Sequence, residues 1–170
     1  MILRVLNALF NAAVTVAVGP GILAHEYAHA LACRLTDVEI EQWPSLALFE
    51  DAATVEHEPV ETFLQDYAIA VAPLVVNSLL AIPALFLATR LDPPVAFGPL
   101  WIGLACGLTA VPSDADTASL LPGVSTLSPT FRPVGYALAV PVRAISYSML
   151  LAGLLALAWT GIILTLVRPA

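Results

Sequence analysis

Long, unbroken hydrophobic runs dominate the pattern of apolar and polar positions along this chain. The runs cover about residues 3–34, 67–90, 95–111 and 134–167, and charged residues and prolines gather in the breaks between them. A membrane-spanning helix needs about 20 predominantly apolar residues, and about 17 is the lower limit. The pattern therefore predicts four transmembrane helices, the fourth long enough to span with tilt or with an interfacial lead-in that carries Arg143.

The first run is interrupted by a Gly-Pro-Gly segment at 19–21. A proline inside a helix removes a backbone donor and kinks the helix, whereas a proline suits the first turn of a new helix. We expect either one kinked helix or two half-helices that meet inside the bilayer. A signal peptide is the alternative here, because an A-x-A triplet at 28–30 imitates a cleavage site. The apolar run continues past that triplet, which favours a spanning segment.

A single polar region, the acidic loop 36–66, separates the first two runs and holds nine of the 13 acidic residues. Apolar and polar residues alternate at 38–41, and short apolar runs follow at 46–49 and 53–55, as is typical of short strands. The predicted fold is an all-α integral membrane protein of one domain, residues 1–170, with a strand-containing acidic loop between its first and second helices.

Composition narrows the class of protein further. Hydrophobic residues make up 59% of the chain and charged residues 11%, whereas a soluble domain carries about 25% charged residues. The two cysteines offer no disulfide framework, and a net charge of −7 disfavours nucleic acid as a partner. We therefore expect a multi-pass protein of the cell membrane, with the lipid bilayer as its solvent.

The candidate metal-binding and catalytic residues lie inside the first run, where His25, Glu26 and His29 form an H-E-x-x-H sequence. Histidines four residues apart share one helix face, about 6 Å apart, and can bind one zinc ion while the glutamate acts as general base on the zinc-bound water. Ionisable side chains in a membrane segment are costly and are candidates for function. The alternative, a His–Glu pair that holds helices together, does not require a second histidine one turn away.

A catalytic zinc ion needs a third protein ligand and an open position for water. Asp114 and Asp116 follow the third run, and counting the membrane crossings puts them on the same side as the two histidines. Ser113-x-x-Asp116 is also a helix-capping pattern. The ligand and capping roles are compatible, so both stay open.

Two further side chains are weaker candidates for the third ligand. His57 belongs to the acidic loop, where its glutamate neighbours are equally typical of a solvated strand. Cys33 follows His29 by one turn, but a small buried residue in a membrane helix is the commoner explanation. Tyr27 points away from the histidine face and is expected to pack.

These residues resemble the site-2 protease class of intramembrane zinc metalloproteases. Members of that class place H-E-x-x-H in one transmembrane helix, follow it with a strand-containing loop and a G-P-x-x-N-type motif, and carry an aspartate at the end of a third core helix. Here the second motif is A-P-L-V-V-N at 72–77, and the third is P-S-D-A-D at 112–116. The latter is similar to the P-S-x-x-D form of short microbial relatives, and the acid-rich, lysine-free composition looks haloarchaeal. The resemblance covers about residues 21–121.

The resemblance implies roles that spacing alone does not. It makes Asp116 the third zinc ligand, with Asp114 as the alternative, and it implies that Asn77 helps to hold the substrate backbone near the zinc ion. A hydrogen bond from Asn77 to a neighbouring helix is the alternative. The strand-like stretch 38–43 is a candidate edge for pairing with an unwound substrate segment.

The expected function is intramembrane hydrolysis of peptide bonds, as a zinc metalloendopeptidase, with transmembrane or membrane-associated proteins as substrates. The alternative is a non-catalytic membrane protein that keeps a structural metal site or binds a partner through its acidic loop. A metal-ion transporter is disfavoured because the second and third runs hold no ionisable residues at 68–88 and 95–111.

Overall fold

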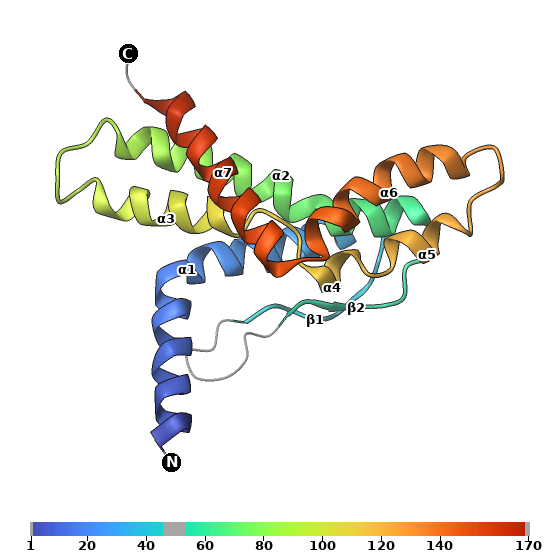
Figure 1. Cartoon of the computed structure of the whole chain (residues 1–170), viewed down its shortest axis with the longest axis horizontal. Helices are drawn as coiled ribbons and strands as arrows, with labels where there is room; N and C mark the ends of the chain where they lie inside the picture. The colour runs from blue at the N-terminus through green and yellow to red at the C-terminus, as the bar shows by residue number, and fades with distance from the viewer. Residues whose placement is uncertain (1, 46–53, 169–170) are drawn as a thin grey trace.

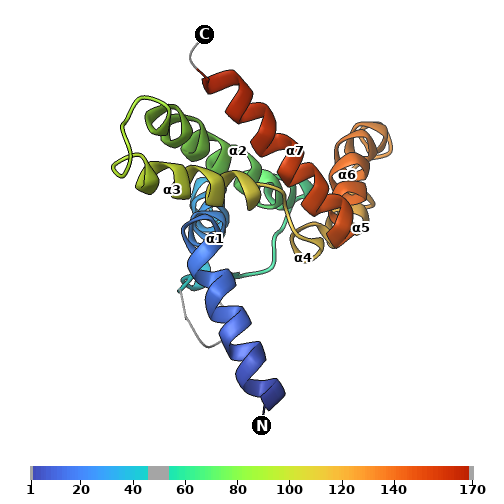
Figure 2. The same ribbon diagram turned by 60° about the vertical axis from the view of Figure 1, so that its left-hand side comes forward.

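The longest helix of the fold, α1, runs from Ile2 to Leu35 and contains Pro20. In the computed structural model, which describes residues 2–45 and 54–168, α1 bends sharply between its two halves, and its first half projects away from the other helices (Figures 1 and 2). Because an internal proline removes a hydrogen bond and clashes with the preceding turn, we attribute the bend to Pro20. One kinked helix is therefore the arrangement adopted.

The second half of α1 packs against α2 (Phe63–Ala88) and α3 (Phe97–Leu108), and these helices form the centre of the protein. A capping box begins α2: the Thr62 hydroxyl accepts from the backbone N–H of Gln65, and the Gln65 side chain accepts from the backbone of Thr62. These bonds satisfy N–H groups that the helix itself leaves free. The helix α2 then runs beside α3 (Figure 1).

Small residues allow the helices to approach closely. A Cβ atom added to Gly103 of α3 would lie 2.6 Å from Cγ of Leu85, and one added to Gly107 would lie 2.7 Å from Oγ1 of Thr160. Glycine at these contacts therefore permits α2 and the last helix to lie directly on α3, as in many membrane helix pairs.

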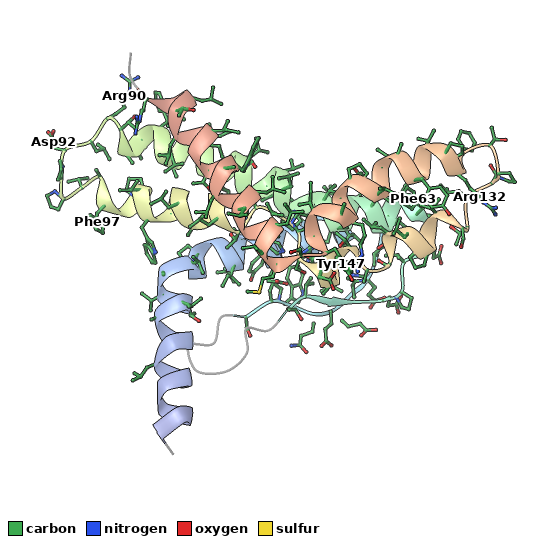
Figure 3. The ribbon with its side chains drawn as sticks, viewed as in Figure 1. Phe63, Arg90, Asp92, Phe97, Arg132 and Tyr147 are labelled. Carbon is green, nitrogen blue, oxygen red and sulfur yellow. The ribbon has the colours of Figure 1, made fainter. Side chains whose placement is uncertain are left out.

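The predicted fourth span, 134–167, consists of two helices, the first of which carries Arg143 in the place of the predicted lead-in. The amphipathic helix α6 (Arg132–Ser146) and the apolar helix α7 (Met149–Val167) meet at Tyr147 (Figure 3), and the Ser148 hydroxyl caps α7 by accepting from the backbone N–H of Leu151. Two short helices, α4 (Asp114–Thr117) and α5 (Leu120–Val124), join α3 to α6. Figure 2 shows α7 crossing the α2–α3 pair.

Within the described part of the chain, α2 and α7 are long and apolar enough to cross a membrane. The third predicted span is shorter than expected: α3 has 12 residues, or about 18 Å at 1.5 Å per residue, against a hydrocarbon thickness of about 30 Å. Of the four predicted spans, those in α2 and α7 are therefore supported, and four transmembrane helices are not confirmed.

The acidic loop contains a small antiparallel sheet, as its alternating pattern predicts. Strand β1 (Ile40–Gln42) pairs with β2 (Glu56–His57), so that Ile40 lies opposite His57. The predicted strand at 46–49 and the start of the run 53–55 lie outside the described residues. The sheet lies beneath the second half of α1 and the start of α2 in Figure 1.

Candidate metal and catalytic site

Three side chains from distant parts of the chain form a compact cluster. His25 and His29 lie one turn apart on α1, with ring centroids 4.9 Å apart. From α4, Asp116 places Oδ2 3.2 Å from Nε2 of His25 and Oδ1 3.4 Å from Nε2 of His29. One ligand atom of each residue lies within 4.8 Å of the others. The three side chains are therefore close enough to bind one metal ion.

Backbone carbonyl groups orient both imidazole rings. Nδ1 of His25 lies 2.7 Å from the carbonyl oxygen of Thr109, and Nδ1 of His29 lies 2.8 Å from that of Ile69. A carbonyl oxygen can only accept, so each Nδ1 carries the proton. In the neutral imidazole Nε2 then has a free lone pair, and on both rings Nε2 is the atom nearest Asp116. This arrangement of outer hydrogen bonds is the one that metal-binding histidines use.

The atoms of the cluster that could bind a metal ion have few hydrogen-bond partners in the protein itself. The side chains of His25, His29 and Asp116 are 12%, 5% and 18% exposed, and buried Nε2 of His29 has no hydrogen-bond partner among the described residues. Two lone pairs and a carboxylate that converge away from water repel one another unless a proton or a cation lies between them. A divalent cation satisfies all three ligands at once, so the residues present fit a metal ion.

Asp116 reaches this position because it also caps α4. The Ser113 hydroxyl accepts from the backbone N–H of Asp116, and Oδ2 of Asp116 accepts from the backbone N–H of Ser113 at 2.6 Å. Burial alone would raise the pKa of Asp116, but the close approach of the His25 and His29 imidazoles outweighs burial and holds the pKa below its usual range. The predicted capping pattern is confirmed, and the same carboxylate faces the histidines as an anion.

Asp114, the alternative ligand, lies elsewhere. Its Oδ1 atom accepts from the guanidinium of Arg143 at 2.6 Å, and its side chain is 60% exposed. The same guanidinium also donates to the backbone carbonyl of Asp114 at 2.8 Å. This ion pair joins α4 to α6, and Asp114 does not belong to the cluster.

Glu26 lies beside the cluster in a cavity of about 470 Å³ that His29 and Asp116 also line. Oε2 of Glu26 accepts a hydrogen bond of 3.1 Å from the backbone N–H of Val55, just before β2. The carboxylate is therefore held by the acidic loop, which also borders the cavity through Val55 and His57. A carboxylate in this position can exchange protons with water or substrate in the cavity.

The weaker candidates for the third ligand lie outside the cluster. His57 lines the cavity, but its Nδ1 atom lies 2.7 Å from the carbonyl oxygen of Glu58. Cys33 is fully buried in an apolar cluster with Val38 and Ile69, as expected of a packing residue. Tyr27 is 46% exposed and lies against Trp43. Among the strands, β2 rather than the 38–43 stretch contributes to the cavity wall.

Asn77 joins three helices behind His25. Its side chain is fully buried, and Nδ2 donates to the carbonyl oxygen of Gly21 at 3.0 Å and to Oγ1 of Thr109 at 3.0 Å. Nδ2 also lies 3.3 Å from the carbonyl oxygen of Thr109 that accepts from His25. The Asn77 amide thus makes hydrogen bonds to neighbouring helices, which was the alternative to a role in holding substrate. Among the described residues, Asn77 is not part of the cavity wall.

The sequence does not indicate that the carbonyl groups of Thr109 and Ile69 orient the histidines, because every residue carries a carbonyl. The importance of Gly21 is weakly indicated by its place in the Gly-Pro-Gly segment. A Cβ atom at Gly21 would overlap the carbonyl oxygen of Ala105 and the hydroxyl of Thr109. Glycine is therefore required for α1 to lie close enough to α3 for His25 to reach Thr109.

Gly21→Ala is expected to destabilise the protein by about 2–3 kcal/mol, because α1 and α3 must separate to admit the methyl group. It should also weaken metal binding, since His25 follows Gly21 by one turn. Thermal unfolding in detergent and metal titration measure the two effects. Gly98→Ala in α3 is the matched control, because a Cβ atom there meets nothing within 4 Å. An unfolding temperature of Gly21→Ala equal to that of the wild type would contradict the close packing.

No protein-family model matches this chain, and neither a curated protein nor a solved structure matches it.

Proposed function

We propose that this protein is a membrane-embedded zinc metalloprotease of the site-2 protease type. The observation that carries the proposal is the convergence of Nε2 of His25, Nε2 of His29 and the Asp116 carboxylate beside Glu26. Two histidines and one carboxylate are a ligand set of catalytic zinc, which leaves a coordination position open. A zinc ion held there supplies a Lewis acid that acidifies water and polarises a peptide carbonyl group.

Glu26 is the proposed general base and acid. It borders the same cavity as His29 and Asp116 but is outside the ligand group. Its carboxylate can therefore take a proton from the attacking water and later return it to the leaving amine. The backbone N–H of Val55 orients the carboxylate through Oε2 and leaves the other oxygen available for that exchange.

The proposed setting is a multi-pass position in the cell membrane. Along α2 and α7 the outward-facing side chains are apolar: Val75, Leu79, Leu150, Leu154 and Leu157 are each more than half exposed. Water would make such exposure costly, whereas lipid tails make it favourable. With about 26 residues, α2 is about 39 Å long at 1.5 Å per residue, enough to cross the hydrocarbon layer.

Transmembrane or membrane-associated proteins are the proposed substrates. The cavity lies at the start of α2, between the helices and the acidic loop, so a chain leaving the bilayer would enter it beside β2. Peptide bonds must be in extended backbone to be attacked, and free strand edges stabilise extended backbone by pairing. The small sheet offers such an edge.

The test is zinc-dependent cleavage by the purified protein in phosphatidylglycerol–phosphatidylcholine vesicles that carry a library of quenched fluorescent transmembrane peptides. Treatment with 1,10-phenanthroline should reduce cleavage to background, and added zinc should restore it, because the three ligands bind the ion reversibly. The non-chelating isomer 1,7-phenanthroline is the control. A zinc-loaded protein that cleaves no member of the library would point instead to a structural metal site.

A further inference from the structure

A third carboxylate, which the metal chemistry does not use, lines the same cavity. Asp66 lies in the first turn of α2, and its side chain borders the cavity together with Glu26, Asp116 and Ser119. The residue is 9% exposed. Figure 3 labels Phe63, which lies one turn earlier and marks this end of α2.

The Asp66 carboxylate has one hydrogen-bond donor among the described residues, as Glu26 does, whereas Asp116 has a donor and both histidines beside it. Oδ1 accepts from the neutral hydroxyl of Ser119 at 2.8 Å, and within the described part of the chain no donor reaches Oδ2. Glu26 accepts from the backbone N–H of Val55, and Asp116 accepts from a backbone N–H and lies against both histidines. Asp66 therefore borders the cavity with one carboxylate oxygen that has no hydrogen-bond donor among the described residues.

No arginine borders the cavity in the described ranges 2–45 and 54–168, and the chain contains no lysine. Arg143 pairs with Asp114, Arg132 donates to backbone carbonyl groups, and Arg34 lies over Trp43. A buried carboxylate without a cationic partner is destabilised as an anion. A ligand that brings a positive charge would remove that destabilisation.

The balance of charge in the cavity identifies the ligand class. A divalent metal ion would balance the two formal charges of Asp116 and Glu26. The charge of Asp66 is then left over. We propose that Asp66 and Ser119 form a subsite that binds the cationic side chain, lysine or arginine, of the peptide substrate. This inference rests on the proposed protease function and names its substrate preference.

The subsite is held rigidly, as a specificity site must be. Phe63 in the first turn of α2 packs with Leu120 and Val124 of α5, and all three side chains are buried. Asp66 follows Phe63 by one turn, and Ser119 directly precedes Leu120. The apolar cluster therefore fixes both polar side chains relative to each other.

His57 is the one competing partner within the described cavity wall, because a protonated imidazole there would itself neutralise Asp66. If Asp66 served His57 alone, removing His57 would change peptide selectivity as much as removing Asp66. The subsite requires the opposite result: selectivity should survive His57→Gln and be lost in Asp66→Asn.

The experiment compares arginine with citrulline, which has the same shape but no charge. Quenched fluorescent peptides of one common sequence carry either residue at each position around the cleaved bond, and kcat/KM is measured for the zinc-loaded protein in detergent. At one position the arginine peptide should be preferred at least about tenfold, because a hydrogen bond to a buried charged group contributes about 1.5–3 kcal/mol. In Asp66→Asn the ratio should fall to near one. Glu61→Gln, an exposed acid just before α2, is the matched control and should keep the wild-type ratio.

A binding measurement separates this inference from the proposed function. Zinc-loaded Glu26→Gln protein is titrated with the same two peptides, with and without Asp66→Asn. If the wild type cleaves nothing but the arginine peptide binds more tightly through Asp66, the subsite stands and the protease assignment fails. Equal affinities, no binding of either peptide, or cleavage without any preference for arginine overturns the subsite.

Discussion

Glu26→Gln is expected to lower the rate of peptide cleavage by about 10²–10⁴-fold while leaving zinc bound at the wild-type level. Glutamine has nearly the shape of glutamate and can still accept the hydrogen bond from the backbone N–H of Val55. It cannot take a proton from water, which is the contribution of a general base. Because Glu26 lies outside the group formed by His25, His29 and Asp116, its charge is not needed to hold the metal ion.

The measurement pairs a cleavage assay with metal analysis of the same purified sample. Glu58→Gln is the matched control, since Glu58 is an exposed glutamate of the acidic loop. It should leave both the rate and the zinc content unchanged. Cleavage by Glu26→Gln at the wild-type rate would remove Glu26 from the mechanism, and loss of zinc from this variant would make it a ligand instead.

Asp116→Asn is expected to reduce zinc affinity by more than about 100-fold, whereas Asp114→Asn should leave it near the wild-type value. The Asp116 carboxylate lies 3.2 Å and 3.4 Å from the two Nε2 atoms, and the Asp114 carboxylate pairs with Arg143 instead. Loss of a direct anionic ligand should exceed the 10–100-fold effect that outer partners of metal ligands have. Competition with a fluorescent zinc chelator measures the affinities.

Asparagine is chosen at position 116 because its side-chain oxygen can still accept from the backbone N–H of Ser113 and so keep the cap of α4. Ser113→Ala separates the two roles of this motif. It removes the hydroxyl that caps α4, at about 1 kcal/mol, and leaves the carboxylate in place. Equal zinc affinities for Asp116→Asn and Asp114→Asn would contradict a three-ligand site built on Asp116.

Local patterns were sufficient to predict the features that depend on neighbouring residues. The H-E-x-x-H spacing places His25 and His29 on one face of any helix, and the Ser113-x-x-Asp116 spacing predicts the cap that begins α4. The alternation at 38–41 predicts a short strand, which β1 overlaps, whereas its partner β2 begins just beyond the predicted run 53–55. Each of these features follows from the geometry of one turn or one strand, so the sequence contains all the information needed.

Hydrophobic length alone did not show where the helices within a run begin and end. The run 134–167 is apolar throughout its second half, yet it divides at Tyr147 because Ser148 caps a new helix and α6 turns to pack on α5. The run 95–111 ends early as a helix, at Leu108. Its last residues instead form the turn that carries the Thr109 carbonyl to His25. In both places the helix ends before the apolar pattern does: Ser148 caps a new helix in the first, and the Thr109 carbonyl contacts His25 in the second.

The sequence by itself determined which side chains are available for chemistry: two histidines and a glutamate on one helix, and a pair of aspartates beyond a distant run. Only the tertiary structure decided which aspartate faces the histidines. The two carboxylates are two residues apart on α4, so one points to α1 and the other to Arg143 of α6. Which carboxylate faces α1 depends on how α4 packs between other helices, and the spacing of residues along the chain does not predict that packing. The same holds for Asp66, which joins the cavity only because α2 and α5 pack together.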